Sequence, residues 1–110
     1  MNNVLKQIKP DIHQLENTEF QLADSLSHKI DRILKQEAFK KGHFKAYDSL
    51  TSREVEIISL VASGLLNPQI AEKLCISRYT VEQHRKNINR KLNIKSIKDL
   101  FQYALAFDLI

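Results

Sequence analysis

The sequence predicts an all-α protein. The chain of 110 residues contains only two glycines and two prolines, too few for the many turns of an all-β domain. Leu, Ile, Lys, Glu and Gln are abundant, and these residues favour helix. Apolar residues also recur at three- and four-residue steps along most of the chain, which is the period of an amphipathic helix. The length fits one small domain with an accessory helix.

Composition narrows the class of protein further. The net charge of +4 and the pI of about 9.3 are compatible with a polyanionic partner. Cys75 is the only cysteine, so an intrachain disulfide is impossible, which suits a reducing compartment. No run of 18 apolar residues and no signal-peptide core are present. We therefore expect a cytoplasmic protein without a membrane segment.

Catalytic and metal-binding patterns are not found in the sequence. His13, His28 and His43 are scattered and lack the paired spacing of metal ligands. No glycine-rich phosphate loop is present. We expect Cys75, which falls in a turn, to be a small buried hydrophobe and not a nucleophile. The sequence thus predicts no enzyme, no metal site and no cofactor.

The first predicted long helix covers residues 18–41. Thr18 and Gln21 form a capping-box pair at its start, and Gly42 is a stop signal at its end. Residues 1–17 are expected to form short helical turns on either side of Pro10. The helix carries one apolar stripe, formed by Leu22, Leu26, Ile30, Ile33 and Leu34.

This apolar stripe must be covered by something, and two interpretations stay open. Residues 1–47 are either a linker segment whose helix packs on the following domain, or a dimerising coiled coil. Glu19 and Lys29 fall on heptad core positions, which weakens the coiled-coil interpretation.

A connector and a second helix follow. Residues 42–50 are expected to form the connector, with Phe44 and Tyr47 against the next domain. The helix over 51–63 should begin with a capping box of Thr51 and Glu54. Gly64 is expected to end it.

Three more helices are predicted over 67–74, 78–92 and 97–107. Asn67 is the expected N-cap of the first, with Pro68 at its first helical position. Ser77 is the expected N-cap of the second, and Ser96 with Asp99 should cap the third. A two-turn helix, a short turn and a longer basic helix form the pattern of a helix-turn-helix, whose second helix enters the DNA major groove.

The helix over 78–92 has two distinct faces. At about 100° per residue, Val81, Ile88 and Leu92 fall together and should face the core. On the opposite side lie Tyr79, Gln83, Lys86 and Arg90, with Glu82 and Asn87 beside them. Residues 77–98 also hold seven basic residues and one acid, whereas residues 1–48 hold eight basic and seven acidic residues. This local basic patch favours contact with DNA phosphates.

Several motifs in the second half closely resemble the LuxR-type helix-turn-helix domain, also called the GerE type. These are Leu50-Thr51-Ser52-Arg53-Glu54, Ala62-x-Gly64, Asn67, Ile70-Ala71-x-x-Leu74, Ile76-Ser77, Thr80-Val81-x-x-His84 and Ile88-x-x-Lys91-Leu92. The resemblance covers residues 48–110 and implies a four-helix DNA-binding domain of a transcriptional regulator that binds as a dimer. It says nothing of residues 1–47. RNA polymerase and a larger regulator are further partners that we consider.

The resemblance also implies roles for single residues. Base contacts would come from Glu82, Gln83 and Lys86. Arg53 and Glu54 would form a structural pair. The expected contacts to the DNA backbone and flanks come from Arg78, Tyr79, Thr80, His84, Asn87, Arg90 and Lys91. Two positions depart from the family pattern, since Glu82 replaces a residue that is most often basic and Asp108 replaces a common glycine.

The last predicted helix is more apolar than a small domain needs. Ile97, Phe101 and Ala104 can face the core, whereas Leu100, Tyr103 and Phe107 lie on another side. An apolar excess on a terminal helix suggests a partner surface, so we expect a two-fold dimer through these three residues. The alternative is an additional core contact with the N-terminal helix.

Three functional hypotheses follow. The first is a sequence-specific transcription factor that binds double-stranded DNA through the helix over 78–92. The second is a protein–protein interaction module that pairs with a full-length regulator and modulates it. The third, the promoter-binding end of a sigma factor, uses a related helix-turn-helix, but the NPQIA and TVEQH segments fit the LuxR type better.

Overall fold

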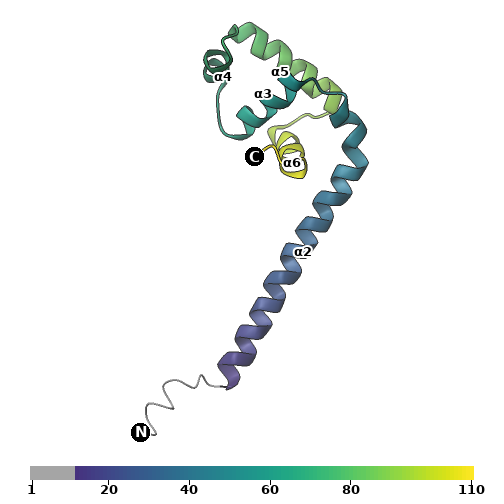
Figure 1. The fold of residues 1–110 in the computed structure, drawn as a ribbon, viewed down its shortest axis with the longest axis vertical. Coiled ribbons are helices and arrows are strands. Elements are labelled where there is room, and N and C mark those ends of the chain that lie inside the picture. Colours follow the sequence, from purple (N-terminus) through teal and green to yellow (C-terminus); the bar gives the residue numbers. More distant parts are fainter. Residues whose placement is uncertain (1–11) are drawn as a thin grey trace. The chain divides into compact units, whose positions relative to one another are not determined.

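The computed structural model describes residues 12–110, with side chains from residue 17 onward. The described residues form helices joined by short turns and contain no strand, which confirms the all-α prediction (Figure 1). None of these helices is both long enough and apolar enough to cross a membrane. The helices are α2 (Ile12–Asp48), α3 (Ser52–Ala62), α4 (Asn67–Leu74), α5 (Arg78–Leu92) and α6 (Ile97–Ala106).

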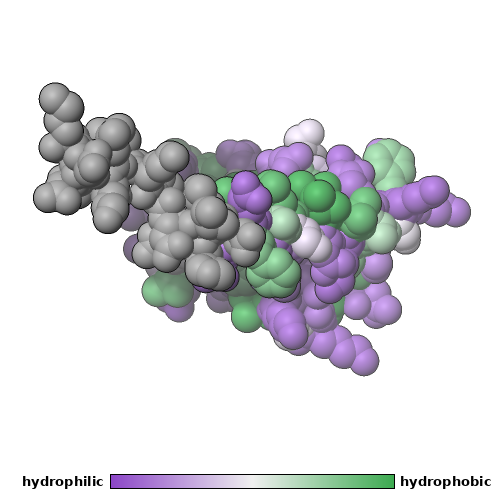
Figure 2. All heavy atoms as spheres, turned by 90° about the horizontal axis from the view of Figure 1, so that it is seen from below, coloured by the Kyte–Doolittle hydropathy of each residue, from purple (hydrophilic) through white to green (hydrophobic). Residues whose placement is uncertain are grey.

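The chain divides into two units, residues 1–35 and residues 36–110, and the boundary falls inside α2. In the first unit the described side chains are all exposed, the large apolar ones included. Figure 2 shows hydrophobic and hydrophilic residues side by side on the surface of the molecule. In the second unit the C-terminal part of α2 belongs to the same compact body as α3 to α6.

The predicted limits of the first helix were wrong. It does not start at Thr18 or stop before Gly42, and residues 42–48 of the expected connector continue the helix to Asp48. Glycine inside a helix costs only about 1 kcal/mol relative to alanine. Phe39 and Tyr47, on either side of Gly42, pack against the core of the second unit and outweigh that cost. The prediction for residues 1–11, including Pro10, lies outside the described residues.

The core of the second unit is centred on α3, which packs against α4, α5 and α6. Ile57 and Ile58 of α3 have no exposed surface, and Ile70 of α4 and Val81 of α5 are buried equally completely. Their burial holds the short α4 against the longer α5, as a helix-turn-helix requires.

Local capping signals set most of the helix starts. The predicted capping box of α3 is present: Glu54 N–H donates to Thr51 Oγ1 (3.1 Å), and Thr51 N–H donates to Glu54 Oε1 (2.8 Å). The N-caps Ser77 of α5 and Ser96 of α6 also form as expected, but the Asp99 side chain accepts from the Lys95 N–H (3.2 Å) and not from Ser96. In α4 the N-cap is Leu66, whose backbone is extended, and not Asn67, which is already helical. Gln69 Oε1 accepts from the Leu66 N–H at 2.8 Å.

The side of α6 that we expected to contact a second copy lies inside the monomer. Leu100 and Tyr103 are 5% and 2% exposed, and Phe107 packs partly against the core. The Phe39 ring of α2 meets the Tyr103 ring edge-on (5.0 Å between centroids), and the Tyr47 ring stacks on Phe107 (3.9 Å). The prediction that Leu100 and Tyr103 are available to a partner was therefore wrong, whereas Phe107 keeps part of its surface exposed. The alternative, additional core contact with the preceding long helix, is what the structure has.

Candidate nucleic-acid interface

The helix α5 starts and ends at residues suited to those positions. Its N-cap Ser77 accepts the Thr80 N–H at 3.0 Å, and the two hydroxyl groups of Ser77 and Thr80 lie 2.7 Å apart. At the other end Asn93 adopts a left-handed conformation (φ 51°), which Asn tolerates better than most residues. Arg90 and Lys91 occupy the last turn, where positive charge is favourable next to the helix dipole.

The two faces of α5 are as predicted. Val81, Ile88 and Leu92 are 0%, 2% and 4% exposed and anchor the helix to the core. On the opposite side Tyr79, which is 68% exposed, Lys86 and Arg90 are open to solvent, and Gln83 between them is half-buried. The chain thus presents a polar ridge, by which we mean the solvent-facing polar side chains of α5.

The structure places the predicted contact residues in two groups. Those that are exposed and free to reach a ligand are Arg78, Tyr79, Glu82, Lys86, Asn87 and Arg90. Those that are half-buried are Thr80, Gln83, His84 and Lys91. Thr80 is tied to the N-cap, and Lys91 is engaged in an ion pair. Gln83 and His84 keep part of their surface in solvent.

The ion pair of Lys91 is inside the domain. Lys91 Nζ donates to Glu54 Oε1 at 2.6 Å, and the two side chains are 26% and 3% exposed. Burial would raise the pKa of Glu54, but the hydrogen bonds from Lys91 and Thr51 outweigh this effect and lower the pKa below its ordinary value. The structural pair is therefore Glu54 with Lys91, and not Glu54 with Arg53. Arg53 pairs instead with Glu56 at 3.4 Å.

A second polar contact joins the two helices of the motif. Arg85 Nη1 donates to Asn67 Oδ1 at 2.8 Å and links α5 to the first residue of α4. The sequence analysis missed this contact because Asn67 looked like an N-cap. No local pattern connects residues 18 positions apart, so only the folded arrangement reveals it.

The turn between α4 and α5 corrects the expectation for Cys75. Its backbone is left-handed (φ 54°), and its side chain is exposed, not buried. The Ile76 N–H donates to the Ala71 carbonyl (3.0 Å) and closes the end of α4. The buried apolar positions of the motif are instead supplied by the helices and, in part, by Ile76.

Comparison with known proteins identifies the domain. Residues 48–104 match the family model for bacterial regulatory proteins of the LuxR family. The chain belongs to the LuxR family. The matched range begins at Asp48, the last residue of α2, and contains α3 to α5 and most of α6. The helix α5, which carries the polar ridge, is therefore the second helix of a LuxR-type helix-turn-helix.

Similar LuxR-type domains are found in curated regulators. The oxygen regulatory protein NreC of Staphylococcus carnosus is 49% identical over 61 residues, which are 56% of this chain and 28% of NreC. The Fimbriae Z protein of Escherichia coli is 46% identical over 61 residues and is covered to 29% of its length. This chain thus spans less than a third of the relatives it matches.

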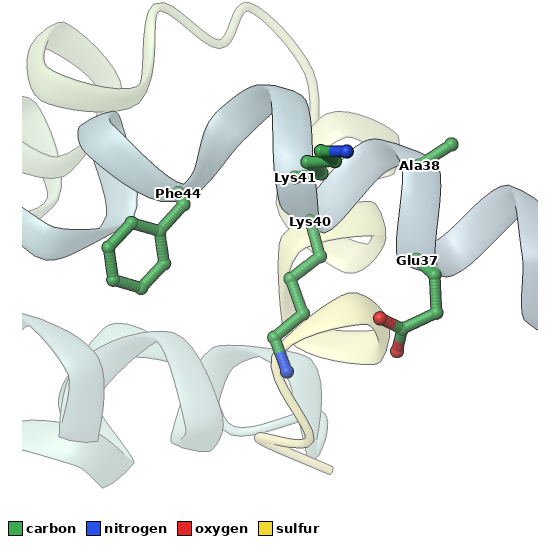
Figure 3. A pocket seen from close by; sticks show the side chains of 5 residues that line it. All are labelled: Glu37, Ala38, Lys40, Lys41 and Phe44. Atoms are coloured by element: carbon green, nitrogen blue, oxygen red, sulfur yellow. The ribbon is translucent and has the colours of Figure 1, made fainter.

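A concave surface also lies along α2 in the second unit, apart from the helix-turn-helix formed by α4 and α5. Figure 3 shows Glu37, Lys40 and Phe44, three of its lining residues, extending to the same side of the helix. The lining combines the carboxylate of Glu37 with the ammonium groups of Lys40 and Lys41, so charges of both signs lie together there. Among residues 17–110 we also find no cluster of three or more His, Cys, Asp or Glu side chains suited to a metal ion.

Proposed function

We propose that this LuxR-type domain recognises a specific DNA sequence with α5 in the major groove and thereby regulates transcription. The observation that carries the proposal is the polar ridge of α5, which stays in solvent while Val81, Ile88 and Leu92 are buried beneath it. A helix of 15 residues is about 22 Å long and fits the major groove, which is about 12 Å wide.

Phosphate contacts would supply most of the affinity. Arg78 and Arg90 lie near the two ends of α5 and are exposed, so they can reach the DNA backbone on both sides of the groove. Tyr79, His84 and Asn87 can add hydrogen bonds to phosphate or sugar. Lys91 is left out of this set, because its ammonium group already pairs with Glu54.

Base contacts would come from the middle of α5, where Glu82 and Lys86 are exposed and Gln83 is half-buried. Gln83 can bind adenine with two hydrogen bonds, and Lys86 can donate to guanine. Glu82, where the family pattern is most often basic, can accept from the amino group of cytosine. Each such contact discriminates against a wrong base by about 1–3 kcal/mol.

The proposal can be tested by selecting bound sequences from a random DNA pool and then comparing two variants on the selected site. Lys86→Ala should cost about 1–3 kcal/mol at one base position and relax specificity there. Arg90→Ala, the matched loss of one exposed cation from the same helix, should weaken all sequences alike and reduce the salt dependence of binding. If the selection yields no preferred sequence, sequence-specific recognition is refuted. A uniform loss for Lys86→Ala would refute its role at a base.

We also propose that the protein binds its site as a dimer. Two copies of α5 placed about one DNA turn apart, roughly 34–36 Å, would contact two half-sites of a palindrome. Two copies make twice as many base contacts as one, so together they recognise a longer and more specific site. RNA polymerase or a larger regulator are the partners through which the bound dimer would act on transcription.

A further inference from the structure

The first unit exposes a row of large apolar side chains on one helix. Leu22, Leu26, Ile30 and Ile33 are 55–59% exposed, and Leu34 is 63% exposed. Their three- and four-residue spacing places them along one side of α2. Burying a Leu or Ile side chain fully gives about 1.5–3 kcal/mol, so covering half of each in this row would still gain several kcal/mol.

The charges of this unit differ between the two sides of the helix. Away from the apolar row, Asp24 pairs with His28 (3.5 Å) and Asp31 with Lys35 (2.9 Å), each one helical turn apart. Glu19 and Lys29, which lie at the row, form no ion pair with any residue in the part of the chain that the structure describes. A partner that covers the row must therefore meet one acid and one base at fixed positions.

We propose that a second copy of this chain covers the row, with the two α2 helices antiparallel. Positions 19, 26 and 33 and positions 22 and 29 are the two core positions, a and d, of one heptad pattern. A parallel pair in register would place Glu19 against Glu19 and Lys29 against Lys29. An antiparallel pair places position a of one helix against position d of the other.

One antiparallel alignment places apolar core residues against apolar ones and the acidic core residue against the basic one. Where Leu22 faces Leu26 of the other copy, Glu19 faces Lys29 of the other copy, and two-fold symmetry forms each contact twice. Moving the alignment by one heptad either way places Leu26 against Lys29 or Glu19 against Leu22. The two charged core positions, which argue against a parallel coiled coil, therefore specify the orientation and the register of an antiparallel one.

This inference goes beyond the proposed function: it names a surface on which two chains associate without DNA, and it rests on no DNA contact. It also agrees with the burial of Leu100 and Tyr103, which removes these two side chains of α6 from contact with a second copy. The interface and the DNA-binding ridge are on different helices, so each can be tested without the other.

The test is sedimentation of the full chain without DNA, over a range of concentrations, for charge-exchanged variants. Glu19→Lys or Lys29→Glu alone should raise the dimer dissociation constant roughly 10-fold or more, because each creates two like-charge contacts. The double variant, with both charges exchanged, should regain the affinity of the unaltered chain to within about 3-fold. Asp31→Lys, on the other side of the helix, is the matched control and should leave the dissociation constant unchanged.

Several outcomes would overturn the proposal. An unaltered chain that remains monomeric at its highest soluble concentration would refute the interface. A double variant no better than the single variants would refute the antiparallel alignment, as would single variants that dimerise like the unaltered chain. Binding of each variant to the selected DNA site at low salt, measured in parallel, separates these outcomes from a failure of the proposed DNA recognition.

Disulfide formation provides a second, independent measurement of the alignment. In a Cys75→Ser background, chains with Leu22→Cys are mixed with chains with Leu26→Cys and oxidised. The proposed alignment brings these two positions together, so the mixed disulfide should dominate. Disulfides formed mainly between two Leu22→Cys chains would instead show a parallel pair and overturn the proposal.

Discussion

The ion pair between Glu54 and Lys91 gives a direct test of what holds α5 against α3. Replacing Lys91 by Met keeps the length of the side chain but removes the donor that lies 2.6 Å from a carboxylate of 3% exposure. Removing one partner of a buried pair typically costs 3–5 kcal/mol. We expect about 3 kcal/mol here, at the lower end, because Glu54 keeps its hydrogen bond from the Thr51 N–H.

The variant of the other partner, Glu54→Gln, should lower the unfolding free energy by less. In Glu54→Gln the side-chain oxygen can still accept from Thr51, and Lys91, which is 26% exposed, can turn towards water. We expect this loss to be about 1–1.5 kcal/mol. Lys91→Met should therefore lose more unfolding free energy than Glu54→Gln, because the group that it leaves unpaired is the more deeply buried one.

The pH dependence has a definite sign. The pKa of Glu54 is lowered in the folded protein, so the pair stabilises the fold above the ordinary pKa of 4.5 and loses this contribution as pH falls through the lower folded value. In Lys91→Met, burial is left with fewer opposing hydrogen bonds, so the pKa of Glu54 rises and protonation relieves the unpaired charge. The destabilisation by Lys91→Met should therefore be largest near pH 7 and shrink towards pH 4.

Urea unfolding followed by circular dichroism, at pH 7 and at pH 4, measures both effects. The unaltered chain and the two variants are compared at each pH, and the change in unfolding free energy is taken from the midpoint shift. A loss for Lys91→Met no larger than that for Glu54→Gln would contradict the burial argument. An equal loss at both pH values would contradict the titration argument.

Two further predictions concern the part of α2 that belongs to the second unit. A Cβ atom added at Gly42 meets nothing within 4 Å, so Gly42→Ala should stabilise the second unit by about 0.5–1 kcal/mol, and a lower unfolding midpoint would show that the helix is interrupted there. Tyr47→Leu removes the ring stacked 3.9 Å from Phe107 and should cost about 1–2 kcal/mol in thermal unfolding, whereas an unchanged midpoint would show that this end of α2 does not stabilise the domain.

The parts of the fold that could be predicted from the sequence are those set by neighbours along the chain. The capping box of Thr51 and Glu54 needs only a spacing of three residues, and the buried side of α5 follows from the helical period. The four helices of the LuxR-type domain were predicted to within one residue at their ends. All of these features depend on short-range geometry.

The features that the sequence analysis missed depend on tertiary contacts. Gly42 is a stop signal by propensity, but its effect is overridden because Phe39 and Tyr47 pack on the core. Cys75 was expected to be buried because of its residue type, yet the turn places it in a left-handed, exposed position. Leu100 was assigned to a dimer surface, although core contact with the N-terminal helix was the stated alternative, because the helical period alone cannot decide which partner covers an apolar side of α6.

The tertiary contacts also explain how the polar ridge of α5 is held in place. Arg85 binds Asn67 of α4, Lys91 binds Glu54 of α3, and the Tyr103 hydroxyl group of α6 donates to the Leu92 carbonyl at 3.5 Å. Three helices therefore fix α5 through polar contacts beside its apolar anchor. Because apolar packing alone tolerates small rotations of a helix more easily than directional hydrogen bonds do, these contacts would set the angle of α5 for the base contacts proposed for Gln83 and Lys86.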